Sequence, residues 1–136
     1  MSKSSSTSLI DKIQKKEARI GIIGLGYVGL PLAVEFAQAG YHVVGIDTDA
    51  IKVDSLNRGE NYIADIPNVI LRDMVSRGQL IATQDYRAIG ELDAISICVP
   101  TPLRKTRDPD MSYVVAASEQ IGKHLSPSTL IILEST

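Results

Sequence analysis

The chain has 136 residues, of which 44% are hydrophobic and 22% are charged, and its formal net charge is -2 at pH 7. These values are typical of one soluble globular domain that is long enough to bury a core. The charge argues against a nucleic-acid partner, because such domains carry a basic surface that neutralises phosphates. The single cysteine excludes an internal disulfide and fits a reducing compartment, which we expect to be the cytoplasm.

The N-terminal stretch, residues 1–18, has no features of a targeting segment. Residues 1–8 (MSKSSSTS) are polar and no long apolar run follows them, so we predict neither a signal peptide nor a membrane anchor. We expect these residues to form a disordered tail. Residues 9–18 (LIDKIQKKEA) have helical composition and are expected to form a lead-in helix, with a partner-binding surface as the less favoured alternative.

The strongest motif in the sequence is a strand, a glycine-rich turn and a helix. The β-branched run at 19–23 (RIGII) is followed by glycines in the pattern G-x-G-x-x-G, and 30–40 (LPLAVEFAQAG) repeats apolar residues at helical spacing. In such a motif Gly24 permits the tight turn, Gly26 lets a pyrophosphate approach the backbone, and Gly29 allows the helix to pack closely. Phosphate binds there because the first helical turn offers free N–H groups.

An acidic residue completes the dinucleotide-binding pattern. Residues 41–46 (YHVVGI) predict the next strand, and Asp47 follows at about the interval expected for a carboxylate that binds the adenine ribose. A helix cap or a solvated turn acid is the alternative interpretation of Asp47. A ribose-binding carboxylate would repel a 2'-phosphate, and the adjacent Thr48 and Asp49 supply no arginine to offset that repulsion. We therefore expect the cofactor to be NAD rather than NADP.

The rest of the sequence alternates helices and strands. Helices are expected at 50–57, 67–76, 85–92 and 113–124, and strands at 80–83, 93–99 and 129–134, the first of these at a sheet edge. Five strands alternating with helices predict an α/β fold of the Rossmann type, a doubly wound parallel sheet in the order 3-2-1-4-5. The last two strands are nearly continuous apolar runs, as in strands covered on both faces. Because the chain stops just after such a strand, we expect a truncated N-terminal domain.

Few residues are candidates for chemistry. Cys98 lies in an apolar strand, where a buried, inert cysteine is the usual case. His42 and His124 have no acid beside them, so we interpret the first as structural and the second as a favourable charge at a helix end. From spacing alone Lys52 faces the adenine ribose or, more favourably, is a solvated helix lysine. Catalytic chemistry is therefore either absent or encoded beyond Thr136.

A proline-rich turn and a charged loop follow the fourth predicted strand. Thr101 lies between two prolines, which make a stiff turn at the carboxyl end of the strand, where doubly wound sheets bind ligands. The loop at 103–110 carries Arg104, Lys105 and Arg107. These either contact a phosphate or are solvated, and the general exposure of charged clusters favours the second interpretation.

Several segments together resemble the N-terminal part of nucleotide-sugar 6-dehydrogenases. They read GLGYVGLPLA, GIDTDAIKV, CVPTPLRKTRDPDMSYV and LEST. Within that family NYIADI and PTPLRKTRDPD are more similar to the branch that acts on UDP-N-acetylglucosamine or forms galactosaminuronate than to UDP-glucose dehydrogenase. The resemblance covers 19–136, which we expect to be an NAD-binding Rossmann domain.

The resemblance implies oxidation of the C6 alcohol of a UDP-hexose to a carboxylate by two NAD, through a cysteine-bound intermediate, for surface polysaccharide precursors. It implies that the backbone of Tyr27 and Val28 contacts the pyrophosphate and that Lys52 lies on the adenosine side. Thr101 would lie near the nicotinamide, and Thr136 beside the reactive centre, where it helps to hold a catalytic water. The implied cofactor site is Gly24, Gly26, Tyr27, Val28, Gly29, Asp47, Lys52, Thr101 and Thr136.

The family's catalytic machinery would lie after residue 136. This includes its nucleophilic cysteine, which Cys98 does not match, its catalytic lysine and asparagine, the dimer-forming helix and the UDP-binding domain. We therefore expect the chain alone to bind NAD without turnover, as a monomer or a weak associate, and the full-length enzyme to be at least a homodimer. The alternatives are another NAD-dependent dehydrogenase, of the hydroxyacid or phosphogluconate type, and a non-catalytic NAD-sensing module.

Overall fold

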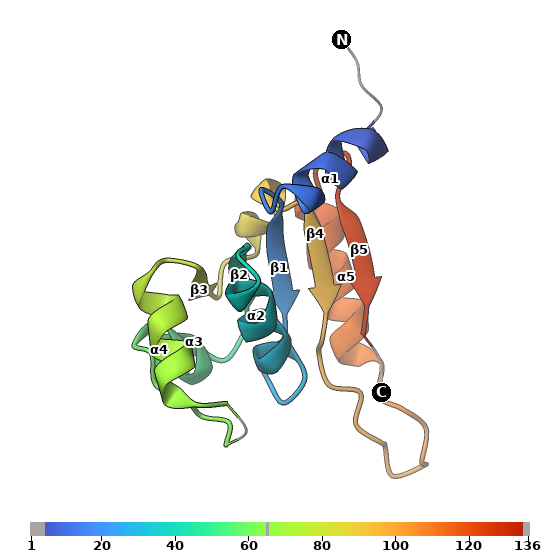
Figure 1. Cartoon of the computed structure of the whole chain (residues 1–136). Helices are drawn as coiled ribbons and strands as arrows, with labels where there is room; N and C mark the ends of the chain where they lie inside the picture. The colour runs from blue at the N-terminus through green and yellow to red at the C-terminus, as the bar shows by residue number, and fades with distance from the viewer. Residues whose placement is uncertain (1–4, 65, 135–136) are drawn as a thin grey trace.

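The computed structural model describes residues 5–64 and 66–134. Its centre is one parallel sheet of five strands in the order β3-β2-β1-β4-β5 (Figure 1). This order confirms the expected Rossmann-type doubly wound fold. The strands are β1 Arg19–Ile23, β2 His42–Ile46, β3 Leu80–Thr83, β4 Ala94–Ile97 and β5 Leu130–Leu133.

Helices cover both faces of the sheet. They are α1 Ser5–Gln14, α2 Gly29–Gln38, α3 Ala50–Asn57, α4 Asn68–Ser76, the 3-10 helix η1 Tyr86–Glu91 and α5 Ser112–His124. Helix α2 lies on one face of the sheet and α5 on the other (Figure 1). The segment expected to form a short helix at 85–92 is thus a 3-10 helix, begun by Asp85, whose side chain accepts a hydrogen bond from the Arg87 N–H. Within the described residues no helix is both long and apolar enough to cross a membrane.

Helix α1 differs from the expected helix at 9–18 at both ends. It begins at Ser5, inside the stretch expected to be a disordered tail, and it ends at Gln14. The other end of α1 is fastened to the sheet: the Lys12 ammonium lies 3.1 Å from an Asp93 carboxylate oxygen, and the Tyr41 hydroxyl donates to the Ile13 carbonyl. These two contacts hold the C-terminal turn of α1 against the sheet.

The two central strands are buried on both faces, which explains their apolar runs. In β1, Ile22 belongs to the core cluster that contains residues of α2, α3 and α4, while the next residue, Ile23, belongs to the cluster that contains residues of η1 and α5. In β4, Ile95 and Ile97 lie on the α5 face, and Ile97 pairs with Ile23 across the sheet. Side chains alternate between the faces along a strand, so a strand covered on both faces needs apolar residues at every position.

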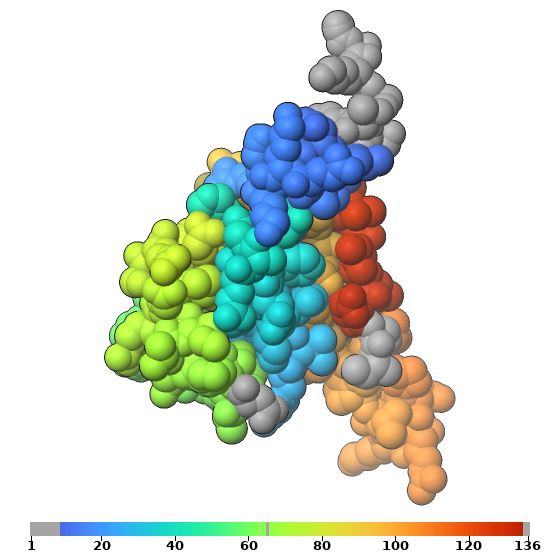
Figure 2. All heavy atoms as spheres, in the orientation of Figure 1, coloured from blue at the N-terminus to red at the C-terminus, as the bar shows by residue number. Residues whose placement is uncertain are grey.

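Strand β5 does not have the surroundings that its sequence predicts. Leu130, Ile131, Ile132 and Leu133 are each 38–50% exposed. The strand pairs with β4 and lies at the margin of the sheet, where it is open to the surface (Figure 2). The expectation that this strand is covered on both faces is therefore wrong for the chain as it stands.

The loop 103–110 is an ordered hairpin that projects from the body (Figure 2). Leu103 and Pro109 form an antiparallel bridge, and the Arg104 N–H donates to the Asp108 carbonyl at 2.8 Å. The Arg104 guanidinium also lies 3.6 Å from a carboxylate oxygen of Asp110. These contacts are made within the hairpin, and its basic side chains are exposed. The solvated interpretation of these charges agrees with this placement.

The glycine turn after β1 sets the distance between α2 and the sheet. A Cβ added to Gly29 would lie 1.6 Å from the Gly24 carbonyl oxygen. Gly24 itself has a φ of +95°, and its own Cβ would lie 2.8 Å from the Cys98 carbonyl. Both positions therefore exclude a side chain, the first through contact with backbone and the second through contact and conformation.

We expect Gly29→Ala to lower the free energy of unfolding by about 3 kcal/mol, since the added methyl group forces α2 away from the turn. Gly122→Ala is the matched control, because Gly122 also lies in a helix but an added Cβ meets nothing within 4 Å. The free energy of unfolding of that variant should rise by about 0.5–1 kcal/mol, because alanine has a higher helix propensity than glycine. Urea unfolding measures both values. Equal effects of the two substitutions would contradict the close-packing argument.

Candidate dinucleotide-binding site

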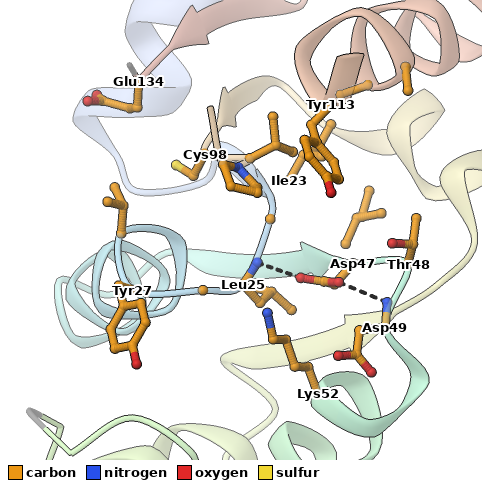
Figure 3. Close-up of a pocket in the computed structure, with 18 of the residues that line it drawn as sticks. Ile23, Leu25, Tyr27, Asp47, Thr48, Asp49, Lys52, Cys98, Tyr113 and Glu134 are labelled. Carbon is orange, nitrogen blue, oxygen red and sulfur yellow. Dashed lines mark hydrogen bonds between the residues drawn. The ribbon is translucent and has the colours of Figure 1, made fainter. Parts of the chain in front are cut away.

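A pocket of about 440 Å³ lies at the carboxyl ends of β1, β2 and β4. Its volume falls in the range typical of small-molecule sites. The glycine turn forms one wall, and the loop after β2 with the start of α3 forms another (Figure 3). In doubly wound sheets this edge, beside the strand where the order reverses, is where ligands bind.

Gly26 is the most open point of the glycine turn. A Cβ built on it would meet only the Lys52 ammonium nitrogen, at 4.0 Å. Among the described residues, the N–H groups of Gly26, Tyr27 and Val28 have no recorded acceptor. They precede the first turn of α2, where the helix dipole is positive. The turn therefore combines bare backbone, free donors and a favourable field for an anion.

Asp47 joins the end of β2 to the glycine turn. Its carboxylate accepts hydrogen bonds from the Leu25 N–H and the Asp49 N–H, both at 2.8 Å (Figure 3). A carboxylate has about four acceptor positions, so two backbone bonds leave capacity for a ligand. The helix cap that was the alternative for Asp47 is instead Asp49, which accepts from the Ile51 N–H and begins α3. Asp47 thus does not cap α3, and it lines the pocket.

Lys52 lies in the pocket rather than on an open helix face. It is half-buried, lines the pocket, and extends toward Leu25 and the glycine turn (Figure 3). Spacing alone favoured a solvated lysine. The position of Lys52, one helical turn after Asp47, does not determine the direction in which its side chain extends. Tyr27 shows the opposite case, with an 85% exposed side chain that points away from Asp47.

The remaining sequence-based candidates are placed differently. Gly24 and Val28 line the pocket, whereas Gly29 lies behind the turn against Gly24. Thr101 is not among the residues that line the pocket, although Pro100 beside it is. Thr136 lies outside the described residues. His42 and His124, like the hairpin arginines, are also absent from the pocket lining.

Three tyrosines belong to the site and were not predicted from the sequence. Tyr86 of η1 and Tyr113 of α5 line the pocket opposite the glycine turn. Burial, and secondarily the charge of Asp47, raises the pKa of the Tyr86 hydroxyl. The hydroxyl of Tyr62 donates a 2.7 Å hydrogen bond to the Leu25 carbonyl. The available signal was Tyr86, which comes shortly after the predicted strand at 80–83, but periodicity does not show which face of the sheet a loop approaches.

Cys98 lies in the pocket wall but is poorly suited to nucleophilic chemistry. Its side chain is buried, and burial raises the pKa of the thiol more than the contact with the Ser96 hydroxyl at 3.5 Å lowers it. The reactive form of cysteine is the thiolate, so a raised pKa makes the residue less reactive. The described residues contain no cluster of three or more side chains able to hold a metal ion.

A turn with free N–H groups, a carboxylate at the end of the second strand and a parallel sheet define a dinucleotide-binding Rossmann domain. The chain belongs to the UDP-glucose/GDP-mannose dehydrogenase family, whose NAD binding domain model matches residues 18–136. This match confirms both the predicted family of NAD-dependent nucleotide-sugar dehydrogenases and NAD as the cofactor.

Several relatives carry N-acetylated sugars in their names. The chain is 44% identical over 119 residues to a UDP-N-acetyl-D-mannosamine dehydrogenase of Salmonella typhi, covering 86% of this chain and 27% of the relative. The structure of the NDP-N-acetyl-D-galactosaminuronic acid dehydrogenase of Methanosarcina mazei Go1 superposes with a TM-score of 0.84 at 34% identity, covering 99% of this chain and 30% of that one. The UDP-D-ManNAc dehydrogenase of Pyrococcus horikoshii gives 0.81 at 37% identity, over 87% of this chain and 28% of that one. The chain thus spans about 27% of the length of the curated relatives.

We expect Cys98 in the folded protein to react with iodoacetamide at pH 8 about tenfold more slowly than in urea, because the thiol is buried and its pKa is raised. The rate should increase as the pH rises toward the raised pKa, since only the thiolate reacts. Mass spectrometry of the peptide that contains Cys98 measures the labelling. Rapid labelling at pH 7 would contradict the assignment of an inert thiol.

Proposed function

We propose that residues 19–136 form the NAD-binding domain of a longer, cytoplasmic UDP-sugar dehydrogenase. Its reaction is the oxidation of the C6 alcohol of a UDP-N-acetylhexosamine to the uronate with two NAD, for the synthesis of surface polysaccharide precursors. The observation that carries the proposal is the pocket in which Asp47 and Lys52 flank the open backbone of Gly26. The family match supports the class of reaction.

The N-acetylated relatives narrow the proposed substrate. Motif similarity pointed toward UDP-N-acetylglucosamine, but the similar curated proteins include UDP-N-acetyl-D-mannosamine dehydrogenases at 37–44% identity. We therefore propose a UDP-N-acetylhexosamine, with the mannosamine sugar ahead of the glucosamine sugar. Another NAD-dependent dehydrogenase family has less support, because an arogenate dehydrogenase of Synechocystis shares only the fold, at 19% identity and a TM-score of 0.59.

The proposed division of work at the cofactor site follows the chemistry of its groups. The free N–H groups of Gly26, Tyr27 and Val28 bind the pyrophosphate, and the Lys52 ammonium adds positive charge on the adenosine side. The remaining acceptor positions of Asp47 bind the ribose hydroxyls. When bound, NAD supplies the hydride acceptor for the oxidation.

The catalytic residues of the proposed enzyme lie elsewhere, with one exception at the end of this chain. Thr101 would lie near the nicotinamide half, and Thr136 would help to hold the water that supplies the second carboxylate oxygen. The nucleophilic cysteine is not in this chain, a proposal that the burial of Cys98 supports. We therefore propose that residues 1–136 bind NAD without turnover and associate weakly, and that the full-length enzyme is at least a homodimer.

Cofactor choice tests the role of Asp47. We expect the full-length protein to bind NADH at least about tenfold more tightly than NADPH, because the carboxylate repels a 2'-phosphate. Asp47→Asn should reduce this preference to below about threefold, since a neutral amide removes the repulsion. Asp54→Asn is the control, because Asp54 is exposed on α3 and does not line the pocket. Fluorescence titration measures all six affinities, and equal binding of NADH and NADPH by the wild-type protein would refute the assignment.

Turnover tests the proposed reaction. The full-length protein should form two NADH per molecule of UDP-N-acetylmannosamine consumed, and should turn over UDP-glucose and GDP-mannose more slowly. Residues 1–136 alone should form no NADH with any of these sugars. Absorbance at the NADH band and mass spectrometry of the sugar product measure the outcome. If residues 1–136 oxidised a UDP-sugar, the proposed location of catalysis would be wrong.

A further inference from the structure

The peptide groups on either side of Leu25 are both held by side chains from outside the glycine turn. On one side, the Leu25 N–H donates to the Asp47 carboxylate at 2.8 Å. On the other, the Leu25 carbonyl accepts from the Tyr62 hydroxyl at 2.7 Å. The Leu25 side chain is fully buried in the core on the α2 face of the sheet. The glycine turn is thus held on both sides of one residue, Leu25, by hydrogen bonds to the side chains of Asp47 and Tyr62.

The bond to Tyr62 also controls the direction of the next donor. The carbonyl of Leu25 and the N–H of Gly26 belong to one planar trans peptide unit, so they point in opposite directions. A hydroxyl that fixes the carbonyl therefore fixes the N–H as well. That N–H has no recorded acceptor among the described residues, and it lies where the turn is open to the pocket.

Tyr62 is itself held in place by the segment between α3 and α4. Ile63 and Ile66 are buried in the core on the α2 face, with exposures of 6% and 7%. The Asn61 side chain accepts from the Ile63 N–H at 2.8 Å and donates to the Ile66 carbonyl. Burial raises the pKa of the Tyr62 hydroxyl, so the group stays protonated and remains a donor.

We propose that Tyr62 is a positioning residue of the dinucleotide site, whose hydroxyl holds the Leu25 carbonyl so that the Gly26 N–H points at the cofactor diphosphate. This inference rests on the proposed placement of the pyrophosphate at the glycine turn. Tyr62 does not line the pocket and acts only through the peptide group. Its effect should consequently appear in the binding of diphosphates and not in the binding of the nucleoside.

The experiment compares Tyr62→Phe with Tyr41→Phe in the full-length protein. Tyr41 is a matched control, because its half-buried hydroxyl also donates to a backbone carbonyl, that of Ile13 at 2.9 Å, at the opposite end of the sheet. Phenylalanine keeps the ring and its packing at both positions. Affinities for NAD, ADP and adenosine are measured by NMR titration, which also reports whether each variant is folded.

Tyr62→Phe should weaken NAD and ADP about three- to tenfold, the usual effect of one lost hydrogen bond, and leave adenosine unchanged. Tyr41→Phe should change none of the three affinities. Unchanged NAD and ADP affinity in Tyr62→Phe would overturn the inference alone, as would an equal loss for adenosine, which indicates general loosening of the fold. A wild-type protein that binds adenosine but gains nothing from the diphosphate would overturn the proposed placement together with the inference.

Discussion

The hydrogen bond between the Asp47 carboxylate and the Leu25 N–H joins the ends of the two strands that make the pocket. Strands β1 and β2 are already paired along their length, from Arg19 with His42 to Ile23 with Ile46. The ladder continues for one bond past each strand, where the Gly24 N–H donates to the Ile46 carbonyl and the Asp47 N–H donates to the Thr83 carbonyl. The next N–H along the chain after β1, that of Leu25, donates to the Asp47 side chain instead of to a backbone carbonyl, and this bond fixes the turn that follows β1.

The Asp47 carboxylate thus has a structural role and a proposed binding role, and both use the same two oxygen atoms. Each carboxylate oxygen already accepts one backbone N–H, from Leu25 or from Asp49. The ribose hydroxyls of the proposed complex would use the remaining lone pairs of the same oxygens. Two fixed donors hold the carboxylate in one orientation before any ligand binds, so the entropy of orienting it is lost on folding rather than on binding. The structural role thus supports the proposed binding role.

Much of the fold could be predicted because its signals are local. Strand β1, helix α3 and strand β3 begin and end where the sequence predicts, since glycines, caps and apolar runs mark their boundaries. The glycine pattern is local in the same sense, because Gly24 and Gly29 contact each other within one turn. The order of the strands followed from handedness, which constrains all βαβ units alike.

The parts that were missed depend on contacts between distant segments. Lys52 faces the pocket because of how α3 packs, and Tyr62 reaches Leu25 across 37 positions of sequence. No periodicity encodes either direction. The exposed side chains of β5 differ from the prediction for another reason. The strand has the apolar composition of a covered strand, but the described residues around it leave its side chains exposed. Composition predicts the environment that a strand requires, which need not be the environment that one segment of chain provides.

The position of Cys98 shows why this thiol is poorly suited to nucleophilic chemistry. Its Cβ lies 3.2 Å from the place that a Gly29 Cβ would occupy, and its carbonyl lies 2.8 Å from the Cβ position of Gly24. The residue is therefore enclosed by the same close packing that brings α2 to the turn, and a small apolar side chain suits that place. An activated nucleophile needs a nearby cation or base and access to the substrate. Room for a cation or base beside Cys98 would require the turn to move away from the sheet, and the N–H groups proposed to bind the diphosphate would move with it.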